Sequence, residues 1–244
     1  MRWIYLSPHL DDAVLSAGGL IYDQTNSGIP VEIWSIMAGV SKETEYSPFA
    51  QLLHHQWGFS SAEETFLARR EEDKKAASLV GATTAHFDFL DGIYRRDENG
   101  EWPYYEISLP PHPMDTDLPG HIADAVSPRL KPDDVLVCQL AVGSHVDHVL
   151  VRMAAEMLGR PLIYDIDVPY IFYKSDELEP KSAGMQENVQ MVTESGIKAW
   201  KEAVLAYASQ LPVLGDAMNT PEVAQKSIHS YWEGHKGIRM YSFK

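Results

Sequence analysis

Two short runs rich in histidine and aspartate each follow directly on an apolar stretch that is typical of a buried strand. The first run, Ser7 to Asp12, follows residues 3–6, and the second, Ser144 to His148, follows residues 134–140. In open α/β sheets, functional groups gather just beyond the carboxyl ends of the strands. If the two strands are neighbours, we expect the two runs to face one another across a single crevice.

Short apolar stretches alternate with helical ones along most of the chain. Predicted strands cover residues 3–6, 31–37, 85–90, 134–140, 162–164, 170–173 and 238–243. Predicted helices cover residues 12–26, 63–80, 121–130, 149–158, 184–209 and 220–233. Such alternation favours a mostly parallel sheet between layers of helices. We therefore predict one α/β domain over residues 1–244, with a Rossmann-like, mostly parallel sheet and helices on both faces.

Two long segments, residues 39–61 and 93–119, carry glycine, proline and aromatic residues and are predicted to be loops. Loops of this length inside a compact domain usually serve a function. The first contains the pair His54-His55, and the second contains His112 and several aromatic side chains. Exposed histidines are the default interpretation for these positions, and the aromatic residues suit either sugar stacking or simple packing.

The charge balance restricts the choice of partners. The chain has 20 Lys and Arg residues against 35 Asp and Glu residues, which gives a formal net charge of −15. Such a surface repels phosphate backbones and anionic lipid, so we expect no nucleic-acid partner. A small neutral or cationic substrate fits better. The sequence does not predict an oligomeric state.

Cysteine content and hydropathy indicate the cellular compartment in which the protein works. Cys138 is the only cysteine, so neither an intrachain disulfide nor a cysteine-based metal site is expected. No apolar run approaches the roughly 18 residues of a membrane span. The charged cluster that begins at His9 is unlike a signal peptide, and we expect a cytoplasmic protein with no membrane span.

The two runs together hold the donors that a catalytic zinc site requires. Such a site takes three nitrogen or oxygen ligands from the protein and leaves one position open for water. We expect His9, Asp12 and His148 to supply these ligands to Zn²⁺, although another divalent metal would suit the same donors. Asp11 lies beside a ligand and is our candidate general base, because zinc makes its bound water acidic enough to donate a proton near neutral pH.

The remaining members of the second run have supporting roles in this hypothesis. His145 precedes His148 by three residues and would stabilise a developing oxyanion or protonate a leaving amine. Asp147 would orient a neighbouring imidazole. Plainer interpretations exist for single residues, since Asp11 or Asp12 would suit a helix N-cap and His145 would suit a cap or a surface position. The metal hypothesis depends on all six groups falling at two equivalent strand ends.

At these residues the chain resembles the PIG-L/LmbE-like family of zinc-dependent N-deacetylases. The family motif Pro-His-Pro-Asp-Asp-Glu corresponds to Pro8-His9-Leu10-Asp11-Asp12-Ala13, and its His-x-Asp-His motif corresponds to His145-Val146-Asp147-His148. The resemblance implies zinc ligation by His9, Asp12 and His148, Asp11 as general base and His145 as the electrostatic or acid partner. Two departures, Leu10 and Ala13, do not affect a ligand.

Weaker matches extend along the chain. Arg69, in a helix with Glu72, resembles an arginine that contacts substrate in the family, and Asp91-Gly92 matches an Asp-Gly pair after the third strand. The resemblance therefore implies substrate binding by Arg69 and Asp91. A solvated helix face and an ordinary turn are the alternatives at these two positions. Some family members carry a tyrosine at the place of Gly143, so any such tyrosine must come from elsewhere here.

The leading functional hypothesis is a metal-dependent amide hydrolase that removes an N-acetyl or other acyl group from an amino sugar or its conjugate. A metal-dependent phosphoesterase is the enzymatic alternative, because clustered histidine and aspartate also suit phosphate hydrolysis. A non-catalytic sugar- or nucleotide-binding Rossmann-like module is the third. Gly18-Gly19 falls inside the first predicted helix and not in a Gly-x-Gly-x-x-Gly turn, so the sequence gives dinucleotide binding no support.

Overall fold

A seven-stranded, mostly parallel sheet forms the centre of the molecule. The computed structural model describes all residues from Met1 to Lys244. The strands are β1 (Trp3–Ser7), β2 (Val31–Ser35), β3 (Thr83–His86), β4 (Val135–Gln139), β5 (Leu162–Asp165), β6 (Gln186–Met191) and β7 (Gly237–Ser242). Their order is β3-β2-β1-β4-β5-β7-β6. The first five are parallel, whereas β7 runs antiparallel to both of its neighbours. The predicted α/β fold class is therefore confirmed.

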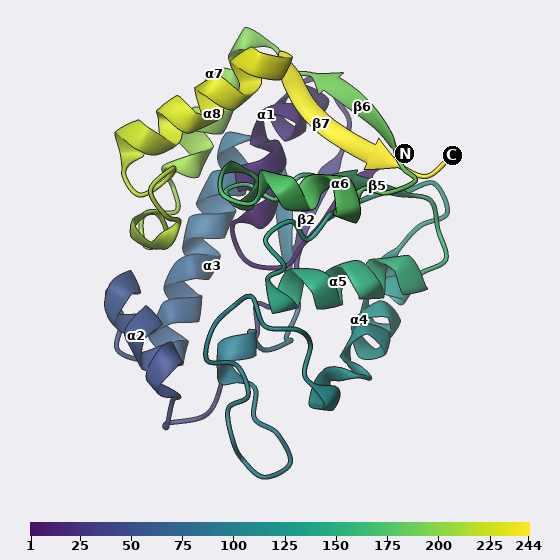
Figure 1. Cartoon of the computed structure of the whole chain (residues 1–244). Coiled ribbons are helices and arrows are strands. Elements are labelled where there is room, and N and C mark those ends of the chain that lie inside the picture. The colour runs from purple at the N-terminus through teal and green to yellow at the C-terminus, as the bar shows by residue number, and fades with distance from the viewer.

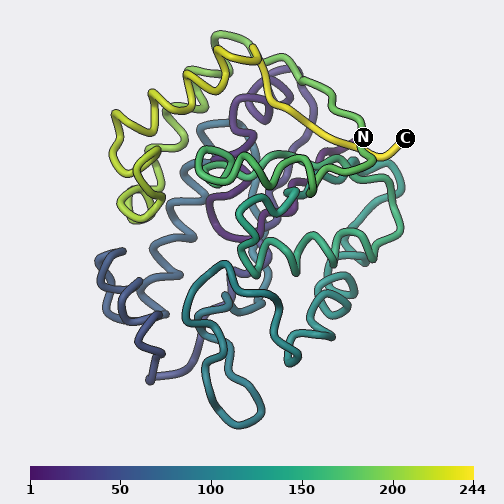
Figure 2. The backbone as a smooth tube through the Cα atoms, viewed as in Figure 1, coloured from purple at the N-terminus to yellow at the C-terminus, as the bar shows by residue number.

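Helices cover both faces of this sheet (Figure 1). They are α1 (Asp12–Asn26), α2 (Pro48–Trp57), α3 (Ala62–Leu79), α4 (Leu118–Val126), α5 (Val146–Met157), α6 (Leu178–Lys181), α7 (Glu194–Val204) and α8 (Pro221–His235). Helices α1, α3, α7 and α8 contact one another in one layer, and α4 packs against α5 in the other. The tube in Figure 2 shows that both chain termini lie at the same side of the molecule.

Strand β1 lies between β2 and β4, so the expected neighbourhood of the two strand ends is confirmed. From β1 the chain proceeds outward through β2 to β3, and it then returns to the other side of β1 to build β4 and β5. This reversal creates a topological switch point between β1 and β4. The loops beyond the carboxyl ends of these two strands diverge there, and that divergence opens a crevice.

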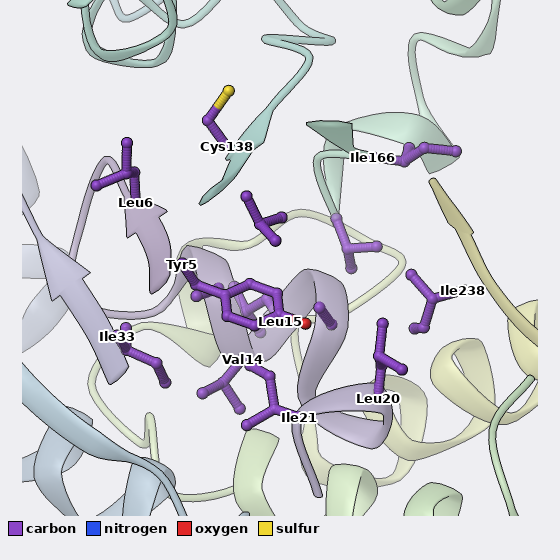
Figure 3. Close-up of a cluster of buried hydrophobic side chains, with 14 of the residues drawn as sticks. Tyr5, Leu6, Val14, Leu15, Leu20, Ile21, Ile33, Cys138, Ile166 and Ile238 are labelled. Atoms are coloured by element: carbon purple, nitrogen blue, oxygen red, sulfur yellow. The ribbon is translucent and has the colours of Figure 1, made fainter. Parts of the chain in front are cut away.

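Side chains of the central strands alternate between the two helical layers, as a pleated strand requires. Tyr5 and Ile33 point toward α1, while Leu6 and Cys138 point to the opposite side (Figure 3). On that side Leu6 lines a tightly filled apolar space with residues of α4 and α5. The core holds 52 contiguous buried hydrophobic residues, so apolar burial on both faces fixes the sheet beneath the crevice.

Gly18 and Gly19 allow α1 and α7 to approach closely. A Cβ atom at Gly18 would lie 2.5 Å from Cδ1 of Trp200, which is fully buried in α7. The Trp200 indole also donates a 2.7 Å hydrogen bond to the carbonyl oxygen of Val14. The glycine pair therefore makes room for an aromatic side chain that ties α7 to the first helix.

Several predicted elements were wrong. Within the segment 184–209, predicted to be wholly helical, residues Gln186–Met191 form the edge strand β6. The segment Tyr170–Phe172 is a 3-10 turn and not a strand. The predicted loop 39–61 contains α2, and the third strand lies earlier than predicted, at Thr83–His86. The polar, exposed β6 has no apolar alternation, because it pairs with β7 and leaves most of its side chains in solvent.

No helix has the length and apolar character needed to cross a membrane. Cys138 is buried within β4 as a free thiol, and burial raises its pKa well above the ordinary value. A buried, protonated thiol is unreactive, so Cys138 serves as a small residue of the core.

Candidate metal centre and active site

The first His/Asp run follows β1 and enters α1 in a conformation in which the Asp11 side chain does not cap the helix. Ser7 Oγ accepts a 3.1 Å hydrogen bond from the Ala13 backbone N–H, so a serine satisfies the start of α1. Asp11 occupies the N-cap position, yet its side chain makes no capping hydrogen bond. The Asp12 carboxylate accepts a 2.7 Å hydrogen bond from the His9 backbone N–H. The simple capping interpretation of Asp11 is therefore wrong.

The second run begins α5 directly across the crevice. His145 is the N-cap of this helix, and its Nδ1 accepts a hydrogen bond of 3.2 Å from the Asp147 backbone N–H. His148 lies in the first turn, with its ring centroid 4.9 Å from that of His145. The His145 and His9 rings are only 4.7 Å apart. The structure thus brings the two sequence runs into one buried cluster.

Three donor atoms converge at the centre of this cluster. His9 Nδ1 lies 3.2 Å from Asp12 Oδ2, and His148 Nε2 lies 3.4 Å from the same oxygen. All three residues are buried, and their ligand atoms lie within 4.8 Å of one another. His148 Nε2 is buried without a hydrogen-bond partner, which is costly for a polar atom. A cation between these donors would satisfy it, so the residue set fits a divalent metal.

Carboxylates behind the two imidazoles orient these donors. His9 Nε2 lies 3.1 Å from Asp147 Oδ2, and His148 Nδ1 lies 2.9 Å from Asp167 Oδ1. A carboxylate accepts hydrogen bonds, so those two ring nitrogens carry hydrogens, and a metal that displaced the proton from the opposite nitrogens would meet their lone pairs. Both lone pairs are on the side of Asp12. This carboxylate–histidine arrangement is typical of protein metal sites.

Asp147 is fully buried and heavily partnered. Besides His9, its carboxylate accepts a 2.7 Å hydrogen bond from Arg95 Nη1 and a 3.0 Å bond from the Gly92 backbone N–H. Burial acts to raise the pKa of Asp147, but the Arg95 guanidinium outweighs it and holds that pKa well below the ordinary value. Asp147 therefore remains a carboxylate, and it lies 3.1 Å from the His9 ring nitrogen Nε2.

Charges around the centre shift the acidity of the flanking aspartates in opposite directions. Burial and then the negative charge of Asp12 raise the pKa of Asp11. Burial acts to raise the pKa of Asp12 as well, but His148 and His9 bring it below its ordinary value. Arg69 Nη2 lies 3.7 Å from Asp11 Oδ2 and limits the rise. The two adjacent carboxylates therefore have different proton affinities, as an acid–base residue beside a metal ligand requires.

Arg69 and Asp91 both reach this site. Arg69 is buried on the inner face of α3, with its guanidinium 5.2 Å from the ring of Trp57. Asp91 Oδ1 caps the short turn η1 (Gly92–Tyr94), and its Oδ2 lies 3.7 Å from His9 Nε2. The solvated-face interpretation of Arg69 is therefore wrong, and Asp91 is more than an ordinary turn residue.

A cavity of about 160 Å³ opens above the cluster. Its floor carries the charged and imidazole groups, namely His9, Asp11, Asp12, Arg69, Asp91 and His145. Its walls are mostly apolar and come from α2, from the segment 93–119 and from the chain after β5 and after α7: Leu53, Trp57, Ile93, Ile107, Pro169, Val213 and Leu214. Asp147 and His148 lie beneath this floor. A substrate would meet hydrogen-bonding groups at the bottom and apolar side chains around the mouth.

Tyr170 occupies the space that a larger residue at position 143 would need. A Cβ atom on Gly143 would lie 2.5 Å from Cδ1 of the tyrosine ring. Tyr170 packs edge-on against His148, with ring centroids 5.3 Å apart, and lines the cavity. Burial raises the pKa of its hydroxyl well above the ordinary value, so the hydroxyl keeps its proton. A tyrosine therefore reaches the site from the turn Tyr170–Phe172, a segment that the sequence predicts to be a strand.

Other functional candidates were missed or misplaced. Asp167, which orients His148, follows β5 just as His9 follows β1, so the same strand-end argument would have found it. Gln210, in the chain that follows α7, also lines the cavity. His54 instead bonds the Tyr94 hydroxyl at 2.6 Å, and His112 caps a short 3-10 turn. Neither of these histidines lines the cavity.

Comparison with known proteins identifies the family. Residues 4–158 match the family model described as PIG-L: GlcNAc-PI de-N-acetylase. The chain belongs to the PIG-L family. The matched region includes both His/Asp runs and the strands that carry them, so the resemblance expected from the motifs is confirmed.

Several proteins similar to this chain are deacetylases. The chain is 25% identical over 231 residues to 2'-N-acetylparomamine deacetylase of Niallia circulans, covering 86% of this chain and 80% of the relative. The zinc-inhibited form of teicoplanin deacetylase Orf2 superposes with a TM-score of 0.84 at 28% identity, covering 99% and 97% of the two chains. N,N'-diacetylchitobiose deacetylase of Pyrococcus horikoshii, with a TM-score of 0.59 and 15% identity over 99% and 82%, shares the fold.

Proposed function

We propose that this protein is a zinc-dependent N-deacetylase that hydrolyses the amide of an N-acetylated amino sugar or its conjugate. One observation carries the proposal: His9 Nδ1 and His148 Nε2 converge on the Asp12 carboxylate in a buried cluster beneath a cavity. Zn²⁺ suits two imidazoles and one carboxylate, because that donor set leaves a position open for water. When bound, the metal supplies a Lewis acid for the amide carbonyl and for water.

Asp11 acts as the general base in this proposal. Its carboxylate makes no capping hydrogen bond and faces the cavity beside Asp12. It accepts a proton from the attacking water and later gives that proton to the departing amine nitrogen, so no net proton remains on the enzyme. The charge of Arg69, 3.7 Å away, opposes the rise of the Asp11 pKa and so favours the ionised form of this carboxyl group.

His145 and Tyr170 stabilise the oxygen of the tetrahedral intermediate. His145 Nδ1 accepts the Asp147 backbone N–H, so the neutral ring carries its hydrogen on Nε2. Burial, together with His9 and His148, keeps the pKa of His145 well below its ordinary value, which preserves this neutral form. The Tyr170 hydroxyl is a second donor on the cavity wall. Donors fixed before the reaction are the most effective way to stabilise a developing oxyanion.

Substrate recognition falls to Arg69 and Asp91 on the cavity floor. The guanidinium of Arg69 suits hydroxyl or carbonyl oxygens of a sugar, and the Asp91 carboxylate suits sugar hydroxyls. The deacetylase relatives act on N-acetylparomamine and teicoplanin by their names, which supports a small N-acylated sugar or sugar conjugate as the substrate class. The acidic chain favours a neutral substrate and a cationic amine product.

The phosphoesterase alternative has weaker support. A second metal beside the first would need the carboxylate of Asp147, which Arg95 and the Gly92 backbone already engage. The cavity floor also carries Asp11, Asp12 and Asp91 against the single guanidinium of Arg69, an arrangement that repels a phosphate dianion. The family assignment points the same way, and a purely binding module has no need of a base next to a metal ligand.

Acetate release tests the proposal. Purified protein loaded with Zn²⁺ should release acetate from N-acetylglucosamine glycosides, whereas chelator-treated protein should not. The same preparations should release no phosphate from aryl phosphates. Phosphate release without acetate release would contradict the proposal.

A further inference from the structure

The catalytic cavity is too small for a whole sugar conjugate. Its volume is about 160 Å³, whereas sites that enclose a drug-sized ligand measure roughly 300–1,000 Å³. The acyl group and the adjoining part of the sugar fill such a space. Any group attached to the sugar must therefore lie outside, against the rim of the cavity.

A second hollow of about 480 Å³ lies beside that rim, between α2 and the segment 101–105. In Figure 2 this segment belongs to the long teal loop that projects from the body next to α2. The hollow is lined mainly by aromatic and apolar side chains: Ser47, Pro48, Phe49, Leu52, Glu101, Trp102, Tyr104 and Tyr105. We call this hollow the aromatic groove.

The aromatic groove adjoins the catalytic cavity along two chain segments at once. Leu52 lines the groove, and the next residue, Leu53, lines the cavity. On the facing segment Tyr105 lines the groove, and Ile107, two residues later, lines the cavity. Consecutive Cα atoms are about 3.8 Å apart, so the linings of the two hollows are neighbours along both segments. We infer that a group attached to a sugar in the cavity extends toward the groove.

The groove wall is held in place before any ligand binds. The Arg96 guanidinium stacks 4.1 Å from the ring centroid of Trp102 and donates to the Gly100 carbonyl oxygen at 3.3 Å. The Tyr104 hydroxyl donates to Asp115 and also accepts the His112 backbone N–H, so the Tyr104 ring is fixed and only 2% exposed. Preorganised surfaces lose little entropy on binding, which favours a ligand-binding role.

The chemistry of the groove selects the ligand. Tyr105 is 71% exposed and Leu52 is 51% exposed, so apolar area faces solvent here. Polar groups are few, because the Ser47 hydroxyl caps α2 and the Tyr104 hydroxyl is already bonded. A second sugar ring would need more hydrogen-bonding partners than Glu101 and the Tyr105 hydroxyl supply. A flat apolar ring would instead stack on the aromatic faces.

We propose that the aromatic groove is a subsite for an aromatic ring joined to the acylated amino sugar. This inference rests on the proposed function, because it places the sugar in the catalytic cavity. Stacking on one aromatic side chain corresponds to a gain in affinity of about three- to tenfold. The groove thus makes the enzyme prefer aryl conjugates to simple sugars.

Calorimetry with the Asp11→Asn variant, in which turnover is expected to be strongly slowed, measures this preference. The probes are the methyl, phenyl and N-acetylglucosaminyl glycosides of N-acetylglucosamine. We expect the phenyl glycoside to bind about tenfold more tightly than the methyl glycoside. In Trp102→Ala/Tyr105→Ala this ratio should fall to about one. Phe243→Ala, which removes an aromatic side chain that is 58% exposed near the C-terminus, should keep the original ratio.

Each other outcome has a definite meaning. Equal binding of the methyl and phenyl glycosides would overturn the subsite while leaving the proposed function intact. Tighter binding of the disaccharide than of the phenyl glycoside would assign the groove to a sugar and overturn the aromatic proposal. Failure of all three probes to bind would overturn both the subsite and the N-acetyl sugar specificity on which it rests.

Discussion

His148 Nδ1 lies 2.9 Å from Asp167 Oδ1, and this contact turns the opposite ring nitrogen toward Asp12. Asp167 lies two residues after β5, whereas His148 lies in the first turn of α5, so the contact joins two adjacent strand-end loops. Neither residue exposes more than 1% of its side chain. The metal-binding geometry therefore depends on a carboxylate that is not itself a ligand.

Replacement of Asp167 should weaken metal binding without removing a ligand. In Asp167→Asn the amide is a poorer acceptor, so His148 loses both its fixed tautomer and part of its basicity. We expect zinc affinity to fall about 10–100-fold, measured by competition with a chromogenic chelator. Asp124→Asn, an exposed carboxylate in α4, is the matched control and should bind zinc as the wild type does. Unchanged zinc affinity in Asp167→Asn would show that Asp167 does not support metal binding through His148.

Asp11→Asn should separate chemistry from metal binding. The asparagine cannot accept the proton of the attacking water, so kcat for acetate release should fall about 10²–10⁴-fold. The ligands His9, Asp12 and His148 are untouched, so zinc content should stay at the wild-type level. Parallel measurement of acetate release and of metal content checks both statements. Wild-type turnover in this variant would show that another group is the base.

Tyr170→Phe should lower the rate and leave the fold intact. The phenylalanine ring still fills the space above Gly143, but it lacks the hydroxyl that we propose as an oxyanion donor. Loss of one oxyanion donor should reduce kcat about 10²-fold with little change in KM. Thermal unfolding, followed in parallel, should give nearly the wild-type Tm. A rise in KM at constant kcat would assign Tyr170 to substrate binding instead.

Gly18→Ala should destabilise the fold through overpacking. The added methyl group would lie 2.5 Å from the Trp200 ring, so α1 and α7 must separate or the indole must rotate. We expect the free energy of unfolding to fall by about 1–3 kcal/mol in urea titrations. Gly234→Ala, in a helix with no atom near the new methyl group, should be neutral or slightly stabilising. Equal stability of the two variants would contradict the close packing.

The sequence predicted the cluster because its chemistry is local to strand ends. His9 and His148 follow β1 and β4, which are buried, β-branched or aromatic in sequence and easily recognised. Their adjacency in the sheet was an assumption, because the order of strands depends on long-range pairing that no local pattern encodes. The PIG-L motifs indicated the chemical role of each residue. The apolar runs predicted the strands that these residues follow.

Other parts of the site could not be predicted from local sequence patterns. Helix α2 begins with Ser47 and Pro48, a recognisable start, but its surroundings of glycine, serine and proline suggested a loop. Tyr170 reached the cavity only because Gly143 leaves space for its ring, a relationship between segments distant in the sequence. Arg69 looked like part of a solvated charged face, since the burial of one face of α3 depends on its tertiary neighbours.

Zinc content of the purified protein tests the central claim most directly. We predict one zinc ion per chain in the wild type. In His148→Ala we expect less than about a tenth of that zinc content, because only two of the three protein ligands remain. Both proteins should be measured after dialysis against the same weak chelator, with circular dichroism as evidence that the variant is folded. A folded His148→Ala protein that still retains one zinc ion per chain would contradict convergence of His9, Asp12 and His148 on a single metal.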